Sequence, residues 1–199
     1  MIGVIDYGAG NLHSVSNALT HLDLSHRLIR HEQDLDDITA IILPGVGHFG
    51  SAMQSLQKSG LVPFLRQWLA ADRPFLGICL GLQLLFDSSE EAPEQPGLGI
   101  IPGTVRRFRA FKIPQIGWNQ VRQIKTGPLF QNCKDESFFY FIHGYYVEPR
   151  DTKWTAGTTD YSLEYVSAVE NGRIAAVQFH PEKSGAVGLE LLRSWGASC

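Results

Sequence analysis

The stretch Leu76-Gly-Ile-Cys-Leu-Gly-Leu-Gln83 sets a cysteine between two glycines, after one apolar run and before another. Glycine weakens both strands and helix interiors, so the pair indicates a sharp turn of the backbone. A G-x-C-x-G pattern after a strand is typical of a nucleophile elbow, in which small neighbours avoid a collision across a strand-to-helix turn. The stretch predicts a strand over 74–78, an exposed nucleophile at Cys79 and a helix over 80–86. The alternative is a buried structural cysteine with incidental glycines.

Short apolar runs and helical patterns alternate through the first half of the chain. Strands are predicted at 2–5, 26–30, 40–44 and 74–78, and helices from Asn11, after the loop Pro44-Gly-Val-Gly47, and over 61–69. Asn11 is a favourable N-cap for the first helix. Alternation of this kind predicts an α/β fold with a central, mostly parallel sheet covered by helices on both faces.

The second half of the chain has a different amino-acid composition. Glycine, proline and β-forming residues dominate from Gly97 to Phe179, which predicts added antiparallel strands. Asn171-Gly172 is a hairpin signal within that region, and a helix is predicted over 185–195. No linker separates the halves, so we expect a single domain over 1–199.

The charge and composition of the chain argue against several classes of protein. A net charge of -3 gives no general attraction to nucleic acid or anionic membranes, and no apolar run approaches the ~18 residues of a membrane helix. The start of the chain shows no secretory leader, and three scattered cysteines argue against a disulfide framework. Gly8-Ala-Gly-Asn11 lacks the further residues of a nucleotide-binding loop. We expect a soluble cytoplasmic protein without cofactor, metal, nucleic-acid partner or membrane partner.

A thiolate nucleophile needs a base, and His180 is the best placed of seven histidines. It follows the apolar strand predicted over 174–179, so it lies at a strand end like Cys79. Glu182, two residues on, can accept a hydrogen bond from the second imidazole nitrogen and fix its tautomer. Alone, His180 reads as a turn histidine before a proline. Together with the elbow, it predicts a triad of Cys79, His180 and Glu182.

The motifs "GICLGLQ" and "QFHPEKS" resemble the nucleophile and His-x-Glu segments of class I glutamine amidotransferases. Three further segments, "IDYGAGNLHS", "PQIGWN" and "YFIHGYY", are similar to those of the glutaminase subunits of imidazole glycerol phosphate synthases in histidine biosynthesis. The resemblance covers essentially the whole chain and implies the class I amidotransferase fold. This chain departs from the usual pattern at Gln115, where histidine is common, and at Gly144, where serine is common.

The resemblance implies hydrolysis of L-glutamine to glutamate and ammonia through a Cys79 thioester, with His180 as base and acid and Glu182 orienting it. Oxyanion donors are expected at the backbone of Leu80 and of Val46 or Gly47. The residues expected to bind glutamine are Gln83, His143, Gly144 and Tyr145.

The resemblance also implies a heterodimer with a separate cyclase of (βα)₈-barrel fold that uses the ammonia. The residues expected at the cyclase interface and ammonia exit are Asn11, Trp118, Asn119, Tyr140 and Lys183. Other readings stay open at this point: an amidotransferase serving another acceptor, a stand-alone γ-glutamyl hydrolase, and a regulatory subunit with a silent site.

Overall fold

Five parallel strands form the centre of the computed structural model, which describes residues 1–8, 10–109 and 112–199. Their order is β2-β1-β3-β4-β12, and the sheet continues through the antiparallel strands β11, β10, β7 and β8. The parallel strands are β1 (Ile2–Ile5), β2 (His26–Ile29), β3 (Ala40–Gly45), β4 (Phe75–Cys79) and β12 (Ile174–Val177). The antiparallel ones are β7 (Gln115–Gln123), β8 (Ser137–His143), β10 (Thr155–Asp160) and β11 (Glu164–Asn171).

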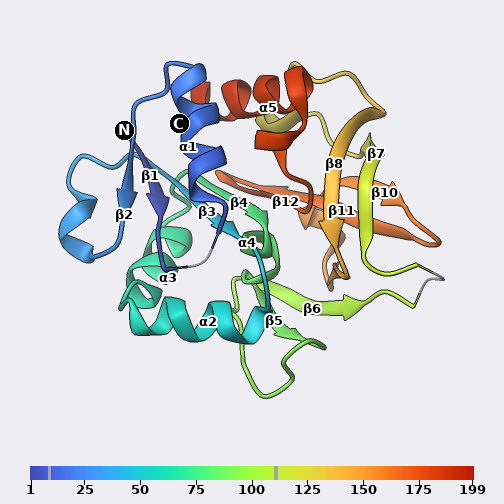
Figure 1. Cartoon of the computed structure of the whole chain (residues 1–199), viewed down its shortest axis with the longest axis horizontal. Helices are drawn as coiled ribbons and strands as arrows, with labels where there is room; N and C mark the ends of the chain where they lie inside the picture. Colours follow the sequence, from blue (N-terminus) through green and yellow to red (C-terminus); the bar gives the residue numbers. More distant parts are fainter. Residues whose placement is uncertain (9, 110–111) are drawn as a thin grey trace.

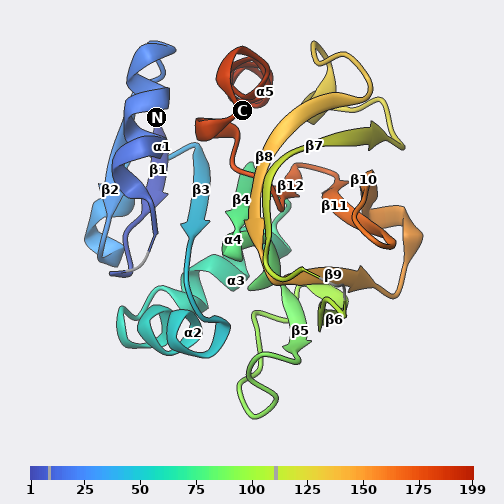
Figure 2. The ribbon, with the colours of Figure 1, turned by 45° about the vertical axis from the view of Figure 1, so that its right-hand side comes forward.

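Helices cover both faces of the parallel strands, as predicted. Helices α1 (Leu12–His21) and α5 (Gly185–Ala197) lie on one side, and α2 (Phe49–Lys58) and α3 (Val62–Ala70) lie on the other (Figures 1 and 2). Every residue of β1, β3, β4 and β12 is buried, and successive side chains enter opposite cores. Ile41 and Leu43 pack with α2 and α3, while Ile42 packs with α1 and α5. This two-sided burial explains the continuous apolar runs in the sequence.

The antiparallel strands extend the same sheet beyond β12. Strands β11 and β12 form the predicted hairpin, with Asn171 opposite Ile174 and Gly172 at φ +60°, a conformation that favours glycine. Three further strands branch from β11: β9 (Tyr145–Pro149) pairs with β11 and with β6 (Ile101–Arg107), and β6 pairs with β5 (Phe86–Ser89) beside α2. No helix in the described part of the chain is long and apolar enough to cross a membrane.

One local prediction was wrong in detail, and a second is confirmed in position only. The helix expected over 80–86 is only α4 (Leu80–Gln83), because Phe86 already belongs to β5 and pairs with Ile101. Strand pairing with a distant segment therefore overrides the helical pattern. Asn11 does occupy the N-cap position of α1, but its side chain makes no capping hydrogen bond, since its backbone (φ -88°, ψ 58°) departs from the extended form.

Candidate active site

Cys79 sits on the strained turn between β4 and α4. Its φ of +55° and ψ of -108° lie in a region that non-glycine residues rarely adopt. Such strain persists only where the surroundings impose it, and it is typical of functional sites. The side chain is only 6% exposed, so the prediction of an exposed cysteine was wrong. Cys79 instead lines a cavity, with its Sγ 4.0 Å from the carbonyl oxygen of Ile142.

The two glycines flanking Cys79 are required by close backbone contacts. A Cβ on Gly77 would lie 2.9 Å from the carbonyl oxygen of Gly81, which is the collision across the turn that the sequence predicts. A Cβ on Gly81 would lie 1.9 Å from the carbonyl oxygen of Leu43 in β3. The second glycine therefore allows the turn to press against the neighbouring strand.

Replacing Gly81 with alanine is expected to lower the free energy of unfolding by about 3 kcal/mol or more, because backbone must move to remove the overlap with Leu43. Urea unfolding followed by circular dichroism measures the loss. Gly144→Ala is the matched control, since a Cβ there meets only Ile113 at 3.4 Å. Equal losses in the two variants would contradict the packing argument.

His180 and Glu182 form a buried pair at the end of β12. Nδ1 of His180 lies 2.8 Å from Oε1 of Glu182, and each side chain is 1% exposed. Burial alone would lower the pKa of His180, but its interactions with Cys79 and with the carboxylate of Glu182 together raise it to about 10. The imidazole is therefore protonated at neutral pH beside the sulfur. Its Nε2 makes no hydrogen bond to any residue in the described ranges.

One cavity of about 220 Å³ contains most of the predicted site. It is small beside the ~300–1,000 Å³ of pockets for drug-sized ligands, so it suits a small metabolite. Its lining residues are Val46, Gly47, Cys79, Leu80, Gln83, Ile142, His143, Gly144, His180 and Lys183. The fold thus brings together residues from the ends of β3, β4, β8 and β12.

The loop after β3 lies directly beside the elbow. Gly45 pairs with Cys79 in the parallel register of β3 and β4, and a Cβ on Gly45 would lie 2.9 Å from Cβ of Leu80. Val46 is 40% exposed, and Gly47 has φ +98°. The peptide groups around Val46 therefore border the cavity next to the nucleophile.

The residues expected to bind substrate are held by a buried hydrogen-bond network. Nε2 of Gln83 donates to the carbonyl oxygen of Tyr145 at 3.3 Å and to Oε1 of Gln178 at 3.1 Å. His143 is buried, with Nδ1 2.7 Å from the Tyr145 carbonyl oxygen and Nε2 3.2 Å from the Tyr165 hydroxyl. Among these residues, Gln83, His143 and Gly144 line the cavity, while Tyr145 fixes its neighbours through its carbonyl group.

The family model described as "Glutamine amidotransferase class-I" matches residues 3–195. The chain belongs to the class-I glutamine amidotransferases. It is 45% identical to "Imidazole glycerol phosphate synthase subunit HisH" of Moorella thermoacetica, covering 98% of this chain and 93% of the relative. It is 44% identical to "Imidazole glycerol phosphate synthase hisHF, chloroplastic" of Arabidopsis thaliana, covering 97% of this chain but 33% of that longer protein.

Solved structures agree with this class I amidotransferase fold. "Structure of PurLQS from Thermotoga maritima" superposes with a TM-score of 0.80 at 17% identity, covering 99% of this chain and 97% of that one. "Crystal structure of glutamine amidotransferase" gives a TM-score of 0.78 at 20% identity, covering 100% and 99%. The predicted parallel sheet with added antiparallel strands is therefore confirmed.

The hairpin of β7 and β8 presents an exposed apolar face. Trp118 is 55% exposed and lies opposite Tyr140, with the two rings packed edge to face at 6.2 Å. Three more exposed apolar residues on the same two strands were not predicted: Ile116, Phe138 and Ile142. Strand β8 is almost continuously apolar in sequence, so the sequence does not say which of its faces stays uncovered.

The other residues expected at an interface have mixed positions in this amidotransferase. Lys183 is exposed and lines the cavity of Cys79. Asn11 is half-buried at the start of α1, which packs against the segment Pro181–Lys183. The side chain of Asn119 does not join Trp118 on the exposed apolar face, because its Nδ2 donates to the carbonyl oxygen of Asp160 at 2.8 Å.

The two departures from the usual amidotransferase pattern lie at the edge of the site. Gln115 is buried opposite His143, and its Oε1 is 3.0 Å from the Tyr165 hydroxyl, which contacts His143 in turn. Gly144 lines the cavity with room for a side chain, so packing does not require glycine there.

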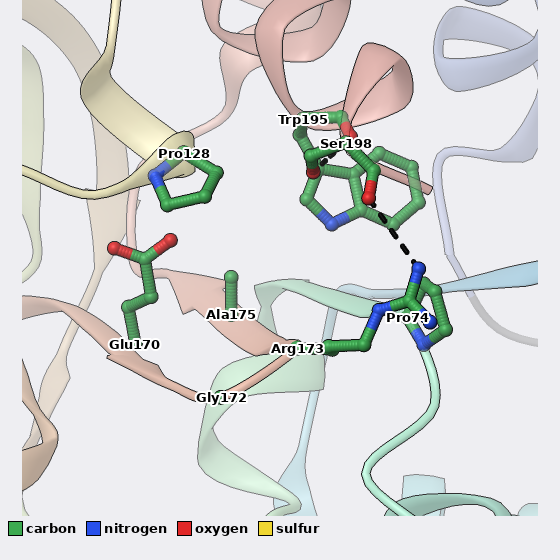
Figure 3. A pocket seen from close by; sticks show the side chains of 8 residues that line it. All are labelled: Pro74, Pro128, Glu170, Gly172, Arg173, Ala175, Trp195 and Ser198. Atoms are coloured by element: carbon green, nitrogen blue, oxygen red, sulfur yellow. Dashed lines mark hydrogen bonds between the residues drawn. The ribbon is translucent and has the colours of Figure 1, made fainter.

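A second cavity, of about 60 Å³, lies at the opposite, amino-terminal ends of β4 and β12 (Figure 3). Glu170 and Arg173 line it together with Trp195 and Ser198. Its lining contains neither cysteine nor histidine, and the guanidinium group of Arg173 donates a hydrogen bond to the carbonyl oxygen of Ser198 at 3.4 Å. It is therefore not the candidate active site.

His143 is expected to make this amidotransferase sensitive to acid. Burial lowers the pKa of His143 to about 4, from 6.5 in the unfolded chain. Between pH 6.5 and 4 the unfolded state binds the extra proton, so stability falls as pH falls through that window, by up to about 3 kcal/mol. Urea unfolding of wild type and His143→Gln between pH 7 and 4 measures this. Parallel pH curves for the two proteins would contradict the prediction.

Proposed function

We propose that this chain is the glutaminase subunit of an imidazole glycerol phosphate synthase, and that it hydrolyses L-glutamine and passes the ammonia to a separate cyclase. The observation that carries the proposal is a strained Cys79 in the same small cavity as the buried His180–Glu182 pair. The names of the HisH relatives support the choice of synthase. The proposal treats residues 1–199 as one amidotransferase domain, supported by the sheet that joins both halves of the chain.

In the proposed mechanism, the Cys79 thiolate attacks the side-chain amide carbon of glutamine. The resulting oxyanion accepts hydrogen bonds from the backbone N–H of Leu80 and from that of Val46 or Gly47, which border the cavity. His180 donates its proton to the leaving nitrogen, so ammonia departs and a γ-glutamyl thioester remains. Neutral His180 then takes a proton from water, which attacks the thioester and releases glutamate and the thiolate.

Substrate binding is assigned to the polar wall of the cavity. Oε1 of Gln83 is the free end of that amide, since its Nε2 is used by Tyr145 and Gln178, and it can accept from the α-ammonium group. The backbone of His143, Gly144 and Tyr145 supplies groups for the α-carboxylate and α-ammonium. The neutral His143 ring holds this backbone in place through Tyr145 and Tyr165.

The cyclase is proposed to dock on the exposed face of β7 and β8. This face carries Trp118, Tyr140, Ile116, Phe138 and Ile142, and exposed aromatic residues are frequent interface anchors. The same interface is proposed to include Lys183 at the exposed rim of the cavity, Asn119 of β7 and Asn11 at the start of α1. We place the protein in the cytoplasm, because Cys79, Cys133 and Cys199 are all free thiols.

The proposal is tested by assaying glutaminase activity of the chain alone and with a (βα)₈-barrel cyclase. We expect low activity alone and strong stimulation by the cyclase with its nucleotide ligand. Full activity of the isolated chain would indicate a stand-alone γ-glutamyl hydrolase. Stimulation by a chorismate-using partner instead would indicate another amidotransferase of the same class.

Replacing Trp118 with alanine is expected to weaken cyclase binding by about 30-fold, since a central interface tryptophan contributes about 2 kcal/mol or more. Titration calorimetry with the cyclase measures the change. Leu28→Ala is the control, because Leu28 is also an exposed apolar residue, 37% exposed, but lies on the opposite edge strand β2. Loss of affinity only in the control would place the interface elsewhere.

A further inference from the structure

Gln178 is a fully buried polar side chain that contacts the nucleophile and that the mechanism above does not use. It follows β12, two residues before His180, and is 0% exposed. Its Nε2 lies 3.7 Å from Sγ of Cys79, within hydrogen-bond reach of sulfur, and its Oε1 lies 3.1 Å from Nε2 of Gln83. Its backbone N–H donates to the carbonyl oxygen of Ser167 at 2.8 Å, which anchors the residue to β11.

The direction of the hydrogen bonds through Gln178 is fixed by the Tyr145 carbonyl group. A carbonyl oxygen only accepts, so Gln83 must present its NH₂ group to Tyr145. The same NH₂ group faces Gln178, which must therefore present its oxygen to Gln83. The remaining end of the Gln178 amide, its NH₂ group, then faces the sulfur of Cys79. Reversing either amide would set two acceptors against each other.

We infer that Gln178 is a hydrogen-bond donor to the Cys79 thiolate and a positioning residue for Gln83. The inference rests on the proposed function, because it concerns the same reaction. A hydrogen bond to an ionised acceptor is about twice as strong as one between neutral groups, and it is stronger still in a buried site. At the same time, holding the NH₂ group of Gln83 leaves its oxygen for the α-ammonium group of glutamine.

A fixed amide donor differs from His180 in keeping its proton throughout the cycle. His180 gives its proton to ammonia and regains one only when it takes a proton from the water that attacks the thioester, whereas the sulfur must be held as an anion before the first attack and after the second. The N–H of Gln178 does not change its protonation during the cycle, so it stabilises the sulfur anion in both halves of the reaction. The sequence motif "QFHPEKS" thus supplies two groups to the nucleophile, Gln178 and His180.

The test uses Gln178→Met, which keeps the approximate volume and removes both the donor and the acceptor. In the assembled complex with the cyclase, we expect kcat for glutamine hydrolysis to fall about 10- to 100-fold. The KM for glutamine should rise as well, because Gln83 loses its orientation. The pH at which Cys79 is half-maximally alkylated by iodoacetamide, followed by mass spectrometry of its peptide, should move upward, since the thiolate has lost a donor.

Gln54→Met is the matched control, since Gln54 is exposed on α2. Gln178→Asn provides a second variant that stays polar but withdraws the amide from the sulfur, and its alkylation midpoint should also rise. Synthesis from ammonium salts should be unchanged in all variants, which reports an intact cyclase, and co-elution of the two subunits reports intact assembly. A folded Gln178 variant with wild-type kcat and an unmoved alkylation midpoint would overturn the inference. An inactive wild-type complex would instead overturn the proposed function.

Discussion

Cys79→Ala is expected to abolish glutamine-dependent synthesis by the assembled complex, while synthesis from added ammonium salts continues. The thiolate forms the bond to the amide carbon, so no other group in the cavity can replace it. Ammonia from solution bypasses this step, because the cyclase chemistry is assigned to the partner. The measurement is the rate of product formation with either nitrogen source, at equal complex concentration.

Cys133→Ala is the matched control for the loss of a thiol. Cys133 is buried like Cys79, but its Sγ contacts only the carbonyl oxygen of Val187 at 3.8 Å among the hydrogen-bond groups of the described residues. Both nitrogen sources should support normal rates in that variant. If Cys79→Ala also lost ammonia-dependent synthesis while the complex remained assembled, the division of labour between the two subunits would be wrong.

Glu182→Gln is expected to lower kcat for glutamine hydrolysis by about 10²–10⁴, as for the orienting carboxylate of other triads. Glu182 holds Nδ1 of His180 at 2.8 Å, and its charge helps to raise the pKa of His180 to about 10. Removal of that charge disfavours the protonated imidazole, so its pKa falls. Loss of activity on the alkaline side should then begin at a lower pH than in wild type, where the imidazolium persists to about pH 10. A kcat–pH profile measures both effects.

Glu164→Gln is the control for removing a carboxylate charge. Glu164 makes an exposed ion pair with Arg122 and does not line the cavity of Cys79, and such pairs contribute little. Its kcat and pH profile should match wild type. A Glu182→Gln enzyme with an unshifted alkaline limb would show that another group sets the protonation of His180.

The sequence was sufficient to predict the parallel half of the fold, because strands buried on both faces leave continuous apolar runs and the helices between them keep a helical period. It predicted the elbow for a physical reason that the structure bears out at Gly77, where a Cβ would meet Gly81. The close approach of Gly81 to Leu43 was not predictable, since it depends on how β3 sits beside β4. The early end of α4 also depends on a distant strand, β6.

The candidate site could be assembled in part from the sequence. His180 and Glu182 are two residues apart, so their pairing could be predicted from their spacing. The contact of Gln178 with Cys79 could not be predicted, because it depends on the position of β12 beside β4. The same holds for the exposed face around Trp118. Its apolar residues are visible in the sequence, but burial by neighbouring strands decides which side remains open.

The central claim is that an ionised Cys79 attacks glutamine beside a protonated His180. Its most direct test is labelling of the assembled wild-type complex with a diazo-ketone analogue of glutamine, followed by peptide mass spectrometry. The account predicts one adduct, on Cys79, with loss of glutaminase activity in proportion to labelling, and protection by glutamine. Labelling elsewhere with Cys79 unmodified, in a complex that still hydrolyses glutamine, would contradict it.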